Sequence, residues 1–355
     1  MLPLQNGETI SIVWEERAYR ARRDIAALAA LGLGVSELHA ESIRLIDDKV
    51  STDLTCWATI DPETLVISTM TGARIAPEYE LWLAEAEYSA NEPNRFAAMA
   101  RRKQAMARLS EVPDGDRNSS TRFNNVWRPL GVDQELRVTF FTDGACWGAA
   151  GMVRSGHDFT DRETDFLAAV APAIASATRL AVRSEAGGRA SGGNPAIVVV
   201  GGRGELCAAT PAAQEWREGI DQIAPGRFMT MMQIMATGAR SATSGGFLAR
   251  LRDARGRWAV LRASPLIGED QDQVAITIEP VNGDQLMSLL VAAYGLTARE
   301  REICREVIAG HSTADIAARL FISVNTVQDH LKSVFAKVGV RSRGELVARL
   351  RPDAQ

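Results

Sequence analysis

Apolar residues recur every three or four positions along residues 323–339, and polar residues fill the face between them. The apolar set consists of Val324, Val327, Leu331, Val334, Phe335 and Val338, and the polar set of Asn325, Gln328, Asp329 and Lys332. A repeat close to 3.6 residues predicts an amphipathic helix with one stripe in a core and the other in solvent. Amides, an acid and a base at this spacing suit hydrogen bonding to base edges, although most amphipathic helices turn such a face to water.

Shorter helices with readable starts are predicted just upstream. Thr297 with Glu300, and Ser312 with Asp315, match the capping box, in which a hydroxyl and a carboxylate each accept an orphan backbone N–H. A tight turn over residues 320–323 then leads into the amphipathic helix. Two helices joined by such a turn, the second with a polar outer face, predict a helix-turn-helix.

The stretches LTAREREI, GHSTADIAARLFIS and NTVQDHLKSVFAKVGVRSRGELV carry this pattern through four helices, the last predicted over residues 342–351. They resemble the LuxR-type helix-turn-helix of bacterial transcription regulators, and the resemblance implies that residues 323–339 form the recognition helix. The DNA-binding residues implied in this way are Thr313, Asn325, Thr326, Gln328, Asp329, Lys332, Lys337 and Arg341. Among them, Lys332, Lys337 and Arg341 are expected to neutralise phosphates.

The operator sequence does not follow from the resemblance. Many members of the family carry a basic residue where this chain has the neutral Gln328, and an acid, Asp329, comes next. Asp329 either accepts a hydrogen bond from cytosine N4 or pairs with Lys332.

The first 183 residues alternate between helical and strand-like patterns. Helices are predicted over 10–33, 35–50, 78–88, 93–109 and 161–183, strands over 55–60, 65–69, 135–142 and 146–154, and a loop over 111–122. Helices flanking an antiparallel sheet form an α+β unit. Trp147 and Gly148 inside a strand, Arg154 at its end, and FTDRETDFL at the start of the last helix resemble the latter half of a GAF-type sensory domain.

GAF domains share a fold and differ in what they hold, which includes cyclic nucleotides, bilins, haem, aromatic acids or nothing. The resemblance therefore specifies no cofactor, and leaves open an unidentified small-molecule ligand in residues 1–183.

A Gly- and Ser-rich stretch, 184–194, lacks large apolar residues and is predicted to be a flexible linker. Residues 195–283 form a second α+β pattern, in which PAIVVVGGRGEL, GRWAVLRASPL and the closing strand QVAITIEPV resemble a reduced PAS-like domain. The apolar segment 286–294 is predicted to be a signalling or dimer helix within the output part, 284–355. The expected fold is thus multidomain: a GAF-like α+β sensor, a small PAS-like α+β domain and an all-α four-helix output domain.

Composition agrees with an ordinary soluble globular protein, because 46% of the 355 residues are hydrophobic and 24% are charged. The net charge is -4, but residues 297–352 carry ten Lys plus Arg against six Asp plus Glu. This tail is therefore +4 and the remainder -8, so that a basic end can approach phosphate. No secretory signal and no apolar run of membrane-spanning length is expected. Four separated cysteines without a CxxC suggest reduced thiols in the cytoplasm.

No catalytic or metal-binding constellation is predicted. The four histidines, His39, His157, His311 and His330, are scattered, and none has the spacing of a metal ligand. GGRGEL at 201–206 is predicted to be a hairpin turn because it lacks a Walker lysine. Met229, Met231, Met232 and Met235 have the spacing of a helix core, and the alternative is that they adapt around an apolar ligand. Cys56 and Cys146 either line a pocket or are buried structural thiols.

The sequence as a whole predicts a cytoplasmic, DNA-binding transcription regulator controlled by a signal sensed in its N-terminal domain. Duplex DNA and a second copy of the chain are the expected partners, RNA polymerase is a further candidate, and no membrane contact or enzymatic activity is expected. An alternative is a sensor that acts mainly through protein–protein contacts. An acyl-homoserine lactone receptor fits less well, because such receptors are shorter and place one sensory domain directly before the output.

Overall fold

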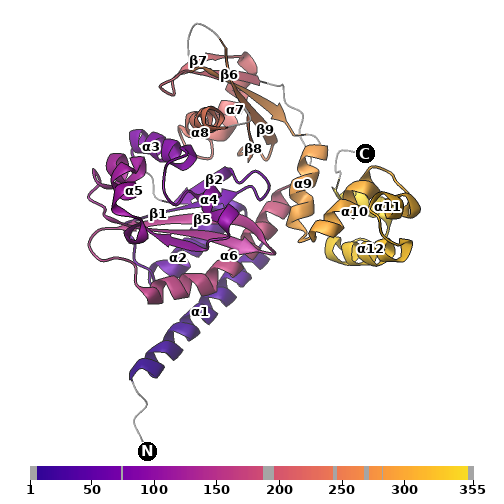
Figure 1. Ribbon diagram of the computed structural model, residues 1–355, viewed down its shortest axis with the longest axis horizontal. Helices are drawn as coiled ribbons and strands as arrows, with labels where there is room; N and C mark the ends of the chain where they lie inside the picture. Colours follow the sequence, from indigo (N-terminus) through magenta and orange to yellow (C-terminus); the bar gives the residue numbers. More distant parts are fainter. Residues whose placement is uncertain are drawn as a thin grey trace, which may run out of the picture.

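Two antiparallel sheets and a group of C-terminal helices follow one another along the chain (Figure 1). The computed structural model describes residues 6–72, 75–186, 196–242, 246–267, 272–281 and 283–350. The first part, which we call the sensor part, contains α1 (Asn6–Ala30), α2 (Val35–Asp47), β1 (Leu54–Ile60), β2 (Ile67–Gly72), α3 (Pro77–Tyr88), α4 (Phe96–Arg102), β3 (Met106–Arg108), α5 (Asp114–Ser119), β4 (Gln134–Thr142), β5 (Ala145–Arg154) and α6 (Asp161–Ala186). Its five strands are arranged in the order β2-β1-β5-β4-β3.

The centre of this sheet is the β4–β5 hairpin, turned at Asp143 and Gly144, where both φ angles are positive, 50° and 74°. Positive φ at both central residues matches the right-handed twist of the strands. Gly148 is required for a different reason: a Cβ there would lie 2.8 Å from the carbonyl oxygen of Ala58 on β1. β1 and β5 can therefore approach this closely only because residue 148, after Trp147, is a glycine.

One face of the sheet is covered by α2 and α6, and α1 packs against these two helices (Figure 1). Trp57, Phe140 and Trp147 are buried there among apolar residues of α6 such as Phe166 and Ile174. The helix α6 has the length and composition of a membrane-spanning segment, but Arg179 and Arg183 interrupt its apolar run, and 56% of its apolar window is buried inside the protein. The covering of a sheet face explains its apolar composition.

Two local predictions in the sensor part are wrong. The helix predicted over 93–109 is helical only over Phe96–Arg102, because Lys103 adopts the left-handed conformation (φ 53°) and ends it. The chain then forms β3, whose Met106 and Arg108 lie opposite Val138 and Leu136 of β4. The loop predicted over 111–122 contains the short helix α5.

The second part, which we call the middle part, has its own sheet. It contains β6 (Ala196–Val200), β7 (Leu206–Ala209), α7 (Pro211–Asp221), α8 (Arg227–Ser241), β8 (Phe247–Arg252), β9 (Trp258–Pro265) and β10 (Val274–Pro280). The strand order is β7-β6-β10-β9-β8, so the strand expected to close the sheet lies at its centre. Met232 and Met235 of α8 are fully buried against this sheet, as the helix-core interpretation of the methionines predicts.

The predicted linker 184–194 overlaps the end of α6 at its start, and its remainder lies outside the described residues. The α+β character of both parts is confirmed, whereas the GAF-like and PAS-like assignments stay predictions.

The C-terminal part contains α9 (Gly283–Ala293), α10 (Ala298–Ile308), α11 (Thr313–Arg319), α12 (Val324–Val338) and α13 (Arg343–Leu350). α9 packs against α6 and connects the two sheet-containing parts to the four helices that follow, which we call the output helices (Figure 1). Just beyond α9, the guanidinium of Arg183 on α6 lies over the ring of Tyr294, 5.1 Å from its centroid.

Candidate nucleic-acid interface and internal cavity

Side-chain caps fix where three of the output helices begin. Thr297 and Glu300 form a reciprocal capping box at α10, and Ser312 and Asp315 form another at α11. The hydroxyl of Ser323 accepts the backbone N–H of Thr326 at 3.0 Å and so caps α12. Each cap satisfies an N–H that has no partner inside its helix, so these starts are set by neighbouring residues alone.

The apolar stripe of α12 holds the output helices together. Val327, Leu331, Val334 and Val338 are buried, and they contact the apolar faces of α10 and α11. Val324 was assigned to the same stripe, but it is 42% exposed at the first position of the helix. The stripe therefore begins one turn later than the sequence pattern predicts.

The opposite face of α12 is open to solvent. Asn325, Thr326, Gln328, Asp329 and Lys332 are all exposed. We call these five residues the α12 ridge. The ammonium of Lys332 lies 3.1 Å from the carboxylate of Asp329, with 77% and 75% of the two side chains exposed. In the free protein Asp329 is thus paired with Lys332, which is one of the two roles predicted for it.

The other three predicted contacts lie around this ridge. Thr313 is half-buried at the first position of α11, and Arg341 is exposed just after α12. Lys337 already has a partner: its ammonium lies 2.7 Å from the carboxylate of Glu300. The expectation that Lys337 also meets a phosphate stays a prediction.

Glu300 connects the start of α10 to α12. Its two carboxylate oxygens accept hydrogen bonds from Ser333 (2.6 Å), Lys337 (2.7 Å) and the backbone N–H of Thr297 (2.7 Å). Burial alone would raise the pKa of Glu300, but these bonds lower it to about 2. The sequence predicts Glu300 only as part of the capping box of α10. Its bonds to Ser333 and Lys337 show that it also orients α12.

The turn between α11 and α12 exposes one aromatic residue that the sequence pattern did not indicate. Phe321 is 94% exposed and adopts a left-handed conformation, with φ at 54°. Its neighbour Ile322 is half-buried and packs against the apolar core of the output helices. The turn thus presents an apolar ring beside the first residues of the α12 ridge.

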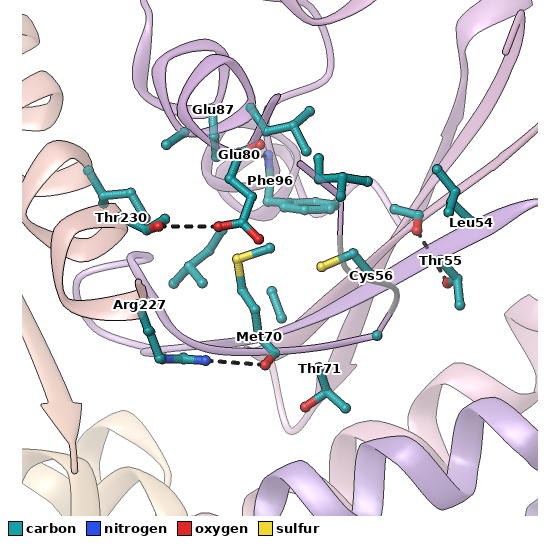
Figure 2. Close-up of a pocket in the computed structure, with 18 of the residues that line it drawn as sticks. Leu54, Thr55, Cys56, Met70, Thr71, Glu80, Glu87, Phe96, Arg227 and Thr230 are labelled. Atoms are coloured by element: carbon teal, nitrogen blue, oxygen red, sulfur yellow. Dashed lines mark hydrogen bonds between the residues drawn. The ribbon is translucent and has the colours of Figure 1, made fainter. Parts of the chain in front are cut away.

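A cavity of about 370 Å³ lies between the face of the first sheet opposite α6 and the middle part. Its walls are β1 and β2, α3, and the start of α8, which belongs to the middle part (Figure 2). Apolar side chains such as Ile67, Leu83 and Ile234 line it, together with the charged Glu80 and Arg227. Because both sheet-containing parts contribute walls, the cavity exists only when they are in contact.

One wall of the cavity is a buried cluster of charges. Arg122 is 2% exposed and pairs with Glu135 at 2.9 Å and with Glu92 at 3.3 Å, while Arg137 pairs with Glu87 and Glu135. Each carboxylate in the cluster has an arginine partner, which offsets the cost of burying it. The charges of this wall are therefore already paired without a ligand, although Nη1 of Arg122 and Nε of Arg137 have no hydrogen-bond partner among the described residues.

A second buried ion pair joins the parts of the protein. Arg250 on β8 donates to Asp61 (2.8 Å) and Glu63 (2.8 Å) in the β1–β2 turn, and to the hydroxyl of Ser288 on α9 (2.9 Å). Arg250 is 8% exposed and Asp61 4%. We call this group the Arg250 joint, because one side chain contacts the sensor part, the middle part and the helix that leads to the output helices.

The thiols and the buried histidine are consistent with structural roles. Burial raises the pKa of Cys56 and of Cys146 to about 12, so both thiols stay protonated, and Cys56 also lines the cavity. Burial lowers the pKa of His39 to about 4, and its Nε2 lies 2.9 Å from the hydroxyl of Thr178. Within the described ranges, no group of three His, Cys, Asp or Glu side chains could hold a metal ion.

Comparisons with known proteins concern the output helices above all. VqmA of Vibrio cholerae, solved with a ligand and DNA, is 17% identical to this chain, and the TM-score is 0.23. The match covers 44% of this chain and 80% of VqmA, and a TM-score this low does not indicate a shared fold. A Mycobacterium bovis protein named as an HTH-type transcriptional regulator is 54% identical over 52 residues, which are 15% of this chain and only 6% of that protein.

Two further comparisons cover the same helices. Residues 295–350 match the family model described as bacterial regulatory proteins, luxR family. The spore germination protein GerE of Bacillus subtilis is 40% identical over 55 residues, which are 16% of this chain and 74% of GerE. Through its output helices, this chain belongs to the luxR family of bacterial regulatory proteins.

Proposed function

We propose that this protein is a DNA-binding transcription regulator whose output helices read duplex DNA under the control of a signal received in the sensor part. The observation that carries the proposal is the α12 ridge, five polar side chains that are all exposed on a helix fixed from behind by four buried apolar residues. A rigid helix with a polar outer face is the element that a helix-turn-helix inserts into the major groove. Family membership of the same residues supports this role.

The eight predicted contacts divide by chemistry. Asn325, Gln328 and Asp329 carry groups that hydrogen-bond base edges, whereas Lys332, Lys337 and Arg341 supply positive charge for phosphates. Thr313 and Thr326 offer hydroxyls near the backbone of the DNA. The first set would determine sequence preference and the second would determine most of the affinity.

The proposal includes the working state of the protein. A homodimer in the cytoplasm would place two copies of α12 about 34–36 Å apart, one turn of DNA, and so read a two-fold symmetric site. RNA polymerase is the further partner such a regulator would meet. No cofactor is required by this scheme, and a small molecule in the cavity is the proposed signal.

The test uses the full-length chain and a random duplex library. Selection and sequencing should enrich one motif, and the affinity for it should fall steeply between about 50 and 200 mM salt. The double substitution Asn325→Ala, Gln328→Ala should abolish the enrichment, while Asn118→Ala, an exposed asparagine of α5, should not. Failure of the unmodified chain to enrich any motif, with no salt-dependent binding, would reject the proposal.

One observation favours the alternative of a protein-contact role, namely the 94% exposed ring of Phe321. If the output helices dock on a protein, Phe321→Ser should abolish that contact and leave duplex binding unchanged. If DNA reading is the main role, the α12 ridge substitutions remain the more damaging ones.

A further inference from the structure

The cavity contains two opposite charges that are not paired with each other. Among the described residues, Arg227, at the start of α8, donates to two backbone carbonyls, those of Met70 at 3.3 Å and Ser68 at 3.4 Å. Glu80, on α3, accepts from the hydroxyl of Thr230 at 3.3 Å. Figure 2 shows both side chains reaching into the cavity from opposite elements, α8 and α3. Among the residues that the structure describes, neither side chain has an ion-pair partner.

The environment makes these charges unusual. Arg227 is half-buried, and burial lowers its pKa, an effect that the nearby negative charge of Glu80 opposes only in part. The other charged side chains among the described residues that line the cavity belong to the ion-paired cluster of Arg122, Arg137, Glu87 and Glu135. A desolvated charge without a partner is costly, and a bound group of opposite charge recovers that cost.

The sign and number of the free charges restrict the occupant. A simple carboxylate would meet Arg227 but would bring a second negative charge close to Glu80, whereas a simple amine would meet Glu80 and repel Arg227. A molecule with one charge of each sign satisfies both side chains. The remaining wall is apolar, and a volume of about 370 Å³ lies at the small end of ligand pockets.

We propose that the cavity binds a small zwitterion with an apolar body, of the class of an α-amino acid with an apolar side chain. Its carboxylate lies against Arg227 of the middle part, its ammonium against Glu80 of the sensor part, and its apolar body against side chains such as Ile67 and Leu83. The ligand therefore bridges the two sheet-containing parts instead of residing in one of them. The inference deepens the proposed function and rests on it only in treating the cavity as the place where the signal is received.

Bridging gives the ligand a way to act on the output helices. The turn after β1 holds Asp61 and Glu63, and both are hydrogen-bonded to Arg250, which also contacts α9. A ligand that tightens the contact between α3 and α8 favours the arrangement in which the Arg250 joint is closed. The ligand thereby shifts the equilibrium between the conformations that differ in the position of α9.

The test is calorimetric titration of the full-length chain with matched probes, in the absence of DNA. L-Phenylalanine and L-leucine carry both charges, 3-phenylpropionate lacks the ammonium, and phenethylamine lacks the carboxylate. We expect at least one of the two amino acids to bind about ten- to a hundredfold more tightly than either single-charge analogue, the effect of losing one charge-assisted hydrogen bond.

Two substitutions then separate the charges. Arg227→Gln should weaken binding of the amino acid and of 3-phenylpropionate by about ten- to a hundredfold, and should not weaken binding of phenethylamine, because it removes a like charge. Glu80→Gln should weaken binding of the amino acid and of phenethylamine by the same factor, and should not weaken binding of 3-phenylpropionate. Arg255→Gln and Glu78→Gln are the matched controls, because both side chains are exposed on the same parts and do not line the cavity.

The comparison of probes on the unmodified chain needs no substitution, so it decides the question even if a variant does not fold. Tighter binding of 3-phenylpropionate or of phenethylamine than of both amino acids would overturn the proposal, as would no binding of any probe at millimolar concentration. The titration contains no DNA, so its result is independent of the duplex selection. If the unmodified chain enriches a DNA motif but binds no amino acid, this inference alone is rejected. If it binds an amino acid but enriches no motif, the proposed DNA-reading role alone is rejected.

Discussion

The output helices and the cavity differ in how far apart along the chain their functional residues lie. The predicted DNA contacts all fall between Thr313 and Arg341. The helices α11 and α12 in this range each begin at a serine that accepts the backbone N–H of the residue three positions later. The cavity takes its walls from residues between Ser36 and Ile234, on elements of both sheet-containing parts. A surface made by neighbouring residues can be read from a pattern, whereas a cavity made by distant ones emerges only from the fold.

Electrostatics differ in the same way. On the α12 ridge, Lys332 and Asp329 are three residues apart and largely in water, so their pairing contributes little. At the Arg250 joint, Arg250 and Asp61 are 189 residues apart and both are buried. Changes in the interior should therefore alter folding, and changes on the ridge should alter DNA binding alone.

The largest effect is expected from Arg250→Met. The substitution leaves Asp61 buried without its guanidinium partner, and breaking a buried pair costs about 3–5 kcal/mol. Denaturant unfolding followed by tryptophan fluorescence should show that loss, because the tryptophans lie outside the output helices. Arg255→Met is the control, since Arg255 is 45% exposed and its contact with Glu218 is 3.7 Å long. Equal stability of the two variants would contradict the role of the joint.

A smaller effect is expected at Glu300. Its pKa is lowered from 4.5 to about 2, so the folded state is stabilised by on the order of 3 kcal/mol above pH 4.5, and this stabilisation is lost as the pH falls toward 2. Glu300→Gln should remove most of it at neutral pH by weakening the bonds to Lys337 and Ser333. Hydrogen exchange measured on peptides of α10 and α12 should then become faster, with α3 unchanged.

Acidification supplies the control for this prediction. Between pH 4.5 and 2 the exchange protection of α12 should fall in the unmodified chain and change much less in Glu300→Gln. Glu302→Gln is the matched variant, because Glu302 is 45% exposed and pairs with Arg299 at the surface. A pH response that is the same in all three proteins would place the stabilisation elsewhere.

The difference between the two regions also explains which sequence predictions were correct. The starts of α10, α11 and α12 follow from Thr297, Ser312 and Ser323, because each cap is a bond between residues close in sequence. The end of α12 follows from Gly339, which adopts φ 74° without strain. Here local chemistry and tertiary structure agree, and the predicted elements are confirmed.

Where contacts between residues far apart in the sequence decide the structure, the pattern of hydrophobic and polar positions did not predict it. Residues 106–108 have the composition of a helix end, yet they form β3 because the edge of β4 offers backbone hydrogen bonds. The charges at Glu80 and Arg227 look like ordinary surface residues of two helices, since nothing in the sequence brings α3 beside α8. The only earlier signal was an arginine at the start of an otherwise apolar, methionine-rich helix.

A still smaller effect is expected from removing one cap. Ser312→Ala deletes the hydroxyl that accepts the N–H of Asp315 and donates to its carboxylate, at a cost of about 1 kcal/mol. Peptides of α11 should lose exchange protection first, and duplex affinity should fall only as far as the folded fraction falls. Ser312→Thr, which restores a hydroxyl that can both accept and donate at the same position, should recover most of the loss, and a variant that does not recover would exclude capping as the cause.

The smallest change in stability, and the most specific change in function, is expected from Lys332→Ala. An exposed pair such as Lys332–Asp329 is worth about 0.2–1 kcal/mol at most, so unfolding should be nearly unaltered. If Lys332 meets a phosphate, affinity should fall for every duplex and the slope of log affinity against log salt should become shallower by about 0.9. If it instead reads the groove, one base position of the selected motif should relax and the slope should hold. Lys103→Ala, at an exposed lysine of the sensor part, is the control. An anisotropy titration identical to that of the unmodified chain would exclude both roles for Lys332, and the ridge would then have to act through its amides alone.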